Sequence, residues 1–127
     1  MAIKSILSFD IGIKTLSFCH CVYENDSVNV KNVESINVLE DNGYKRKAPP
    51  KVEVVANFII DSLERRFSDL NVDYIVIEQQ PYGPHSNTKM KIFSYVVYSY
   101  FAVQRRREEK VTTFLSPKAK IPARSEA

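Results

Sequence analysis

The order of the predicted secondary-structure elements is the feature that most restricts the fold of this chain. Three segments rich in β-branched and aromatic residues come first, and two helical segments then alternate with two short strand-like segments. A crossover between strands of one sheet is right-handed, so the strands that follow the helices should run parallel to a neighbour. The sequence predicts strands at 3–11, 15–23, 27–39, 72–78 and 110–115, and helices at 49–71 and 88–107.

A mixed five-stranded sheet is the simplest α/β arrangement that satisfies this order. The first three strands form an antiparallel meander, and the strand around Ile75 lies beside the first strand on its other side. Gly12, in the "GIK" stretch between the first two strands, is expected to supply a permissive backbone position for a hairpin. The stretch "EDNGYKRKAPP" is expected to be a loop, because it is polar and contains Gly43 and two prolines.

Length and composition indicate one globular domain, 1–127. A chain of 127 residues with 44% hydrophobic and 26% charged residues can bury one core but is too short for two domains. No apolar run approaches the roughly 18 residues of a membrane span, and the first residues lack a signal-peptide pattern, so we expect an intracellular protein with no membrane partner. Cys19 and Cys21 are poorly placed to bridge each other, and His20 between them points to the opposite face, which argues against a zinc site.

Charge is distributed unevenly along the chain. Residues 1–80 contain 9 basic and 12 acidic side chains, whereas residues 81–127 contain 9 basic and 3 acidic ones. A basic carboxy-terminal third fits contact with a polyanion such as nucleic acid. A solvated helix end around Arg105, Arg106 and Arg107 explains the same charges equally well.

Two carboxylates are predicted to meet at one edge of the sheet. Asp10 lies late in the first strand, between apolar residues, and Glu78 ends the strand expected beside it. Two anions at one edge repel each other unless a cation lies between them, and oxygen ligands suit Mg²⁺ or Mn²⁺ far better than zinc. The alternative is that Glu78 is simply a solvated residue at the end of a strand. A carboxylate-bound metal ion can activate water for phosphodiester cleavage.

Three stretches of the sequence together resemble a known family. "SFDIGIKTLSF", "YIVIEQQPYGPHSNTKMKIFSYVVYSYF" and "FLSPKAKI" occur in the order seen in the Holliday junction resolvases of poxviruses and other large DNA viruses. These are relatives of RuvC and of the mitochondrial resolvases in the ribonuclease H-like superfamily. The resemblance covers nearly the whole chain. It implies a ribonuclease H-like fold and a dimeric, Mg²⁺-dependent endonuclease that resolves four-way DNA junctions during viral recombination and replication.

The resemblance also implies roles for individual residues. Asp10 and Glu78 match the first two catalytic, metal-binding carboxylates, and Lys118 in "SPKAK" matches a catalytic or phosphate-contacting lysine. A helix that is apolar nearly all round, as Ile92 to Val103 is, is more often a core element than an interface. The resemblance implies a homodimer, with an exposed apolar side of this helix as the contact. The predicted DNA contacts are Lys14, Tyr82, His85, Lys89, Lys91, Arg105, Arg106 and Lys120. A spacer role in the loop explains Tyr82 and His85 equally well, and Lys45, Arg46 and Lys47 form a basic loop that is either solvated or in contact with a DNA arm.

One departure from the family pattern bears on activity. Such resolvases complete the site with two more aspartates on a helix after the last strand, whereas the last aspartate in this sequence is Asp73. The sequence therefore resembles a family member truncated at its carboxy terminus, and we expect the chain as given to cleave slowly or only to bind DNA. If it is viral, we expect it in the host-cell cytoplasm, in replication factories, or in the virion.

Two other functions fit parts of the sequence. The first is a non-catalytic ribonuclease H-like DNA-binding module, which the missing aspartates favour. The second is a nucleotide-binding phosphotransferase of the sugar kinase and actin type, whose phosphate loop also follows a D-x-G hairpin. That class requires a longer chain with a glycine-rich adenosine site, and three glycines in 127 residues argue against it.

Overall fold

A computed structural model describes residues 3–79, 87–106, 108 and 110–115 of the chain. It contains five strands and three helices over these residues. Their bounds are β1 (Lys4–Ile11), β2 (Thr15–Glu24), β3 (Ser27–Asn37), α1 (Val38–Asp41), α2 (Val52–Phe67), β4 (Tyr74–Glu78), α3 (Thr88–Arg105) and β5 (Val111–Leu115).

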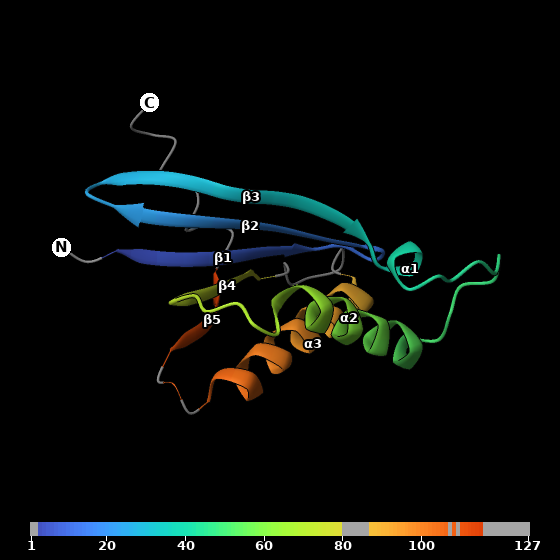
Figure 1. Cartoon of the computed structure of the whole chain (residues 1–127). Helices are drawn as coiled ribbons and strands as arrows, with labels where there is room; N and C mark the ends of the chain where they lie inside the picture. Colours follow the sequence, from blue (N-terminus) through green and yellow to red (C-terminus); the bar gives the residue numbers. More distant parts are fainter. Residues whose placement is uncertain (1–2, 80–86, 107, 109, 116–127) are drawn as a thin grey trace.

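The strands form one mixed sheet in the order β3-β2-β1-β4-β5. The first three strands are antiparallel, and β4 is parallel to both β1 and β5. Figure 1 shows α2 and α3 side by side along the same side of this sheet, with α1 at the end where β3 finishes. The predicted mixed sheet, with the fourth strand beside the first, is confirmed.

The alternation of side chains along β1 decides which face of the sheet the helices cover. Leu7, Phe9 and Ile11 are buried, whereas Asp10 between them is exposed. Phe9 packs with aromatic rings from β2, α2 and α3, and the ring centroids in this group are 4.9–6.1 Å apart. Burying such rings is strongly favourable, at about 25 cal/mol per Å² of apolar surface. This core fixes the opposite face of the sheet, which no helix or strand of the described residues covers, as the one that presents Asp10.

An irregularity between β2 and β3 keeps three valines on the uncovered face. The register pairs Cys21 with Val30 but His20 with Asn32, so Lys31 is an extra residue in β3. One extra residue restores the alternation after a slip in phase, as in a β-bulge. Val28 and Val30 before the extra residue and Val33 after it are therefore all exposed.

Two local expectations were wrong. The strand expected at 27–39 ends at Asn37, and the short helix α1 takes up the end of that predicted strand and the start of the predicted loop. The backbone N–H groups of Leu39 and Glu40 donate to Asn37 Oδ1 at 3.1 Å. Gly12 does not take a positive φ; among the described glycines only Gly43 does. A Cβ at Gly12 would come 2.7 Å from Thr15 Oγ1, so this position calls for a small residue because of space.

A charged cluster joins α1 to α2. The Asp41 carboxylate accepts hydrogen bonds from Arg66 at 2.6 and 2.8 Å, from Arg65 at 2.7 Å and from the Ser62 hydroxyl at 2.7 Å. The Arg66 guanidinium, more than any other neighbour, holds the pKa of Asp41 well below its usual range. The cluster therefore stabilises the fold only while Asp41 is ionised.

Asp41→Asn is expected to lower the free energy of unfolding by about 2 kcal/mol at pH 7, because the charged hydrogen bonds are lost. The folded pKa of Asp41 is depressed, so its contribution is complete above the unfolded value of about 3.9 and disappears as the pH falls below it. Urea unfolding of both proteins at pH 7 and near pH 3 measures this difference, which should shrink at the lower pH. Asp61→Asn, at an exposed position of α2, is the matched control. A gap between Asp41→Asn and wild type that stays constant with pH would contradict this account.

None of the helices within the described residues is both long and apolar enough to cross a membrane.

Candidate functional site

Asp10 and Glu78 lie at the same edge of the sheet, as the sequence predicted. The parallel register of β1 and β4 pairs Phe9 with Ile77, which places Asp10 and Glu78 at the next position of each strand. Neighbouring strands are about 4.8 Å apart, so the two carboxylates start from adjacent backbone positions. Their side chains point to the face opposite the core, since Phe9 and Ile77 are buried.

Both carboxylates line one hollow on the uncovered face of the sheet. Its volume is about 350 Å³, and it extends from Asp10 and Glu78 over the apolar or weakly polar side chains of neighbouring strands. Residues from all five strands contribute, among them Cys19, Val33 and Leu115. The acids therefore occupy one end of a mostly apolar surface depression.

The two carboxylates supply the kind of donor atom that a divalent metal ion requires. Two carboxylates at adjacent register positions fit Mg²⁺ or Mn²⁺, which take oxygen ligands and keep several waters when few protein ligands are present. Within the residues that the structure describes, no group of three or more His, Cys, Asp or Glu side chains is placed to bind a metal. The described residues therefore fit a divalent metal ion that is held by two protein ligands, which would be Asp10 and Glu78.

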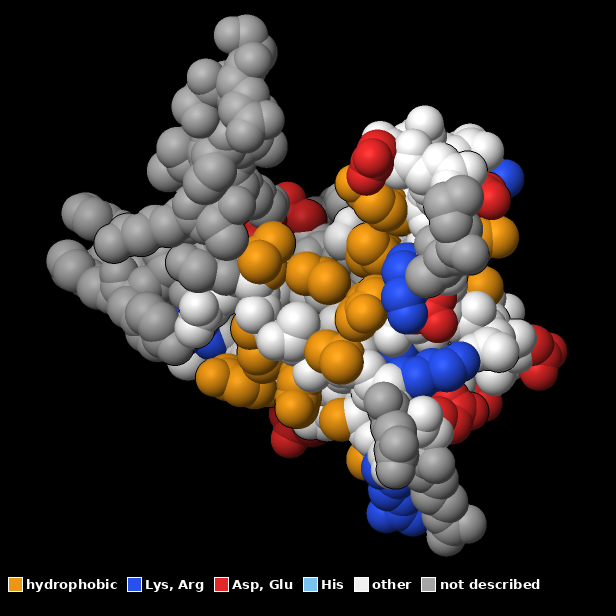
Figure 2. Space-filling view, turned by 90° about the vertical axis from the view of Figure 1, so that its left-hand side faces the viewer, with side chains coloured by type: hydrophobic (Ala, Val, Ile, Leu, Met, Phe, Trp, Pro, Cys, Tyr) orange, Lys and Arg blue, Asp and Glu red, His pale blue; other side chains and the backbone are white. Residues whose placement is uncertain are grey.

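Apolar side chains extend the surface beyond the acids. Val33 is 69% exposed and Val28 is 59% exposed, although both belong to a strand of the sheet. Figure 2 looks at the end of the molecule that carries the β2–β3 turn, and it shows hydrophobic side chains gathered across the middle of that view, with lysine and arginine side chains to one side.

The lysine and arginine residues that were predicted to contact DNA lie in different parts of the structure. Lys14, after β1, and Lys89, in the first turn of α3, line a common cavity although 75 positions separate them in the sequence. Arg46 and Lys47 of the basic loop line the same cavity. Lys91 lies two residues further along α3, about half a helical turn from Lys89. Arg106 is exposed just beyond the other end of that helix. The structure therefore groups Lys14 with Lys89 and separates both from Arg106.

Arg105 was predicted to contact DNA phosphates, and the structure contradicts this. Its side chain is 5% exposed, and its guanidinium donates to the backbone carbonyls of Val72 and Asp73 at 2.8 Å and of Val111 at 3.3 Å. Burial lowers the pKa of Arg105 from its usual value. This arginine connects the end of α3 to the chain before β4 and to the start of β5, so it has a structural role.

Four predicted site residues lie outside the described residues: Tyr82, His85, Lys118 and Lys120. Their predicted roles stay predictions.

One side of α3 is buried and the other carries exposed apolar residues. Phe93, Val97 and Phe101 are buried in the core, whereas Tyr95 is 56% exposed and Val103 is 63% exposed. These two residues, with Ile60 of α2, line a shallow groove of about 730 Å³ between the helices. The helix therefore acts as a core element on one side and leaves the other side available for a protein contact.

Comparison of the structure with solved structures identifies the same fold in Holliday junction resolvases. The yeast mitochondrial Holliday junction resolvase Ydc2 matches with a TM-score of 0.69 and 21% identity, over 95% of this chain and 56% of that chain. Thermus thermophilus RuvC matches with a TM-score of 0.60 and 10% identity, over 91% of this chain and 64% of that chain.

A third match is the fowlpox virus resolvase in complex with substrate Holliday junction DNA, with a TM-score of 0.52 and 19% identity, over 89% of this chain and 60% of that chain. The chain thus spans little more than half the length of the yeast enzyme. No family model and no curated protein sequence matches the chain. These likenesses establish the ribonuclease H-like, RuvC-type fold predicted from the sequence.

Proposed function

We propose that this chain is a Mg²⁺-dependent, structure-specific endonuclease that resolves four-way DNA junctions. The observation that carries the proposal is the placement of Asp10 and Glu78 at adjacent register positions of β1 and β4, in one hollow. The chain presents this pair on a fold that it shares with Holliday junction resolvases. The proposed setting is recombination and replication of viral DNA in the host cell, in line with the likeness to the fowlpox enzyme.

The chemistry follows from what the two acids can hold. A bound Mg²⁺ or Mn²⁺ would polarise the scissile phosphate and lower the pKa of a coordinated water. Exposed Asp10 and half-buried Glu78 would together hold this ion. The mostly apolar hollow beside the acids is where a phosphodiester backbone would approach them. A second ion would require carboxylates in addition to this pair.

DNA binding is expected to favour a four-way junction over linear duplex. Lys14, Lys89, Lys91 and Arg106 are proposed as phosphate contacts on the described surface. A fluorescence anisotropy titration in EDTA, with a junction and with a duplex of the same arm sequence, measures the preference separately from cleavage. Affinity should fall steeply with salt, with a slope of about 0.9 per phosphate contact on duplex arms. Equal affinity for junction and duplex at matched salt would count against junction recognition.

We also propose that the protein forms a homodimer through the exposed side of α3, because two opposed strands must be cut to resolve a junction. The exposed apolar residues of the groove between α2 and α3 support this contact. Val103→Glu is therefore expected to convert a dimer into a monomer, as measured by sedimentation equilibrium. Val28→Glu, at an equally exposed apolar position of β3, should leave the mass unchanged. A wild-type protein that sediments as a monomer would reject the dimer.

A non-catalytic DNA-binding module is the second candidate. The observation in its favour is that the described residues offer two metal-binding carboxylates and no larger group. Junction binding with no metal-dependent cleavage, at any Mg²⁺ or Mn²⁺ concentration, would favour this function over the first.

A further inference from the structure

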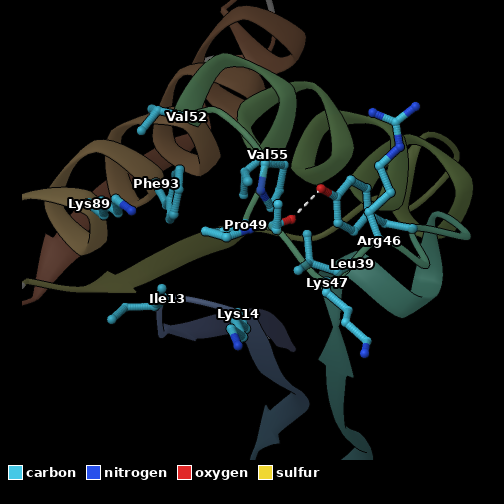
Figure 3. A pocket seen from close by; sticks show the side chains of 13 residues that line it. Ile13, Lys14, Leu39, Arg46, Lys47, Pro49, Val52, Val55, Lys89 and Phe93 are labelled. Carbon is cyan, nitrogen blue, oxygen red and sulfur yellow. Dashed lines mark hydrogen bonds between the residues drawn. The ribbon is translucent and has the colours of Figure 1, made fainter.

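A second cavity lies at the end of the sheet where β1 turns into β2. It is bounded by the β1–β2 turn, by residues 44–50, and by the first turns of α2 and α3 (Figure 3). The cavity has a volume of about 280 Å³ and is separate from the hollow that contains Asp10 and Glu78. The cavity combines residues from five segments that are far apart in the sequence.

The inner wall of this cavity is apolar. Phe93 and Val55 are core residues of α3 and α2, and Ile13 and Leu39 close it from the turn and from α1. Figure 3 shows Ile13 facing Phe93 across the opening, with Pro49 between them and Val55. Apolar and aromatic side chains around a hollow of this kind suit the face of a nucleobase, since every base can pack or stack regardless of its sequence.

The rim of the cavity is basic. Lys14, Arg46, Lys47 and Lys89 all line it, and none of the acidic residues that the structure describes does. In Figure 3 the charged groups of Arg46 and Lys47 point away from the inner wall, while Lys14 and Lys89 lie on different sides of the opening. Long lysine and arginine side chains keep their charged ends in water and can reach an anion at the mouth. The distribution fits a ligand with an apolar planar part and a phosphate on each side of it.

Residues 44–50 form a preformed wall. The Tyr44 backbone N–H donates to Leu39 O at 2.9 Å, and the Tyr44 hydroxyl donates to Ala48 O. The Tyr44 ring also packs edge-on against Phe58 of α2, with centroids 6.1 Å apart. Pro49 and Pro50 restrict the backbone that follows. A wall fixed in this way loses little entropy when a ligand enters.

We propose that this cavity holds one unpaired nucleotide of a DNA strand, with its base against the apolar wall and its phosphates on the basic rim. The proposal rests on the proposed function, because a four-way junction supplies nucleotides that can leave the base stack near the cleavage site. Ile13 follows Asp10 by three residues, which is about 10 Å along an extended chain at ~3.3 Å per residue. The cavity would therefore position the strand whose backbone passes the two acids.

Binding of a fluorescein-labelled single-stranded oligonucleotide, followed by anisotropy in EDTA, tests the proposal without any need for cleavage. The double variant Lys14→Ala/Lys89→Ala is expected to bind about tenfold more weakly, with the salt slope reduced by about 1.4 for two lost phosphate contacts. Ala48→Trp, which places a large side chain at an exposed position of the cavity lining and keeps all four charges, is expected to weaken binding to a similar degree.

Lys31→Ala is the matched control, because Lys31 is exposed on β3 and outside the cavity. The inference is overturned if either cavity variant binds the oligonucleotide as Lys31→Ala does. A free deoxynucleoside monophosphate that binds as tightly as the oligonucleotide would assign the cavity to free nucleotides and reject a strand-binding role. The junction-versus-duplex titration of wild type is independent of these variants. Suppose that wild type binds junction and duplex equally well, while the cavity variants still bind the single strand more weakly than wild type. This result would reject the proposed function and leave the cavity proposal standing.

Discussion

Asp10→Asn is expected to lower the single-turnover rate of junction cleavage in Mg²⁺ by roughly 100- to 1,000-fold. Asparagine keeps the shape of the side chain but removes the charge that binds the metal. A Lewis-acidic metal supplies several kcal/mol of charge stabilisation in the transition state, and each 1.4 kcal/mol is about a factor of ten in rate. The same loss is expected in Mn²⁺. The measurement uses enzyme in excess over a labelled junction and follows the first turnover.

Asp26→Asn is the control for this variant, since Asp26 is exposed in the β2–β3 turn and asparagine suits its positive φ. Junction affinity in EDTA should be nearly the same for wild type and both variants. A metal-dependent rate that is equal in Asp10→Asn and wild type would show that the catalytic ligands lie elsewhere in the chain.

Arg105→Met is expected to lower the free energy of unfolding by about 3 kcal/mol, because buried carbonyl groups lose a charged donor. The guanidinium donates to the carbonyls of Val72, Asp73 and Val111, and an apolar side chain of similar length cannot replace these bonds. Urea unfolding at pH 7 measures the change.

Arg106→Met provides the comparison, because the neighbouring arginine is exposed. It should change the stability by less than about 0.5 kcal/mol, as most surface substitutions do. Equal stability of the two variants would mean that Arg105 does not connect α3 to the sheet in solution.

The sequence was sufficient to predict the sheet and the acidic edge. The positions of Asp10 and Glu78 follow from the element order and from the parallel pairing that crossovers impose, so no side-chain detail was needed. In the sequence of β3, Val28 and Val30 are two positions apart but Val30 and Val33 are three apart, and the structure explains this break by the extra residue Lys31.

The burial of Arg105 and the cap of α1 were not predicted, although the sequence contains a local pattern for each. Arg105 continues the four-residue spacing of Phe93, Val97 and Phe101, which marks the buried side of α3, but the adjacent arginines made it look like part of a solvated end. The cap of α1 had a local signal, Asn37 followed three residues later by Glu40, but this signal lay across the boundary between the predicted strand and the predicted loop.

No local sequence pattern indicates the cavity beside the β1–β2 turn. It forms only when the turn, residues 44–50 and the start of α3 meet in the folded chain. The spacing between Lys14 and Lys89 in the sequence gives no indication that they share a site.

A titration with Mn²⁺, followed by electron paramagnetic resonance of the free ion, tests the central claim that Asp10 and Glu78 bind one divalent cation together. The account predicts that wild type removes Mn²⁺ from solution and that Mg²⁺ displaces it. Asp10→Asn and Glu78→Gln should each lose this binding, while Asp26→Asn should keep it. Undiminished Mn²⁺ binding by both Asp10→Asn and Glu78→Gln would contradict the shared site, and with it the proposed endonuclease.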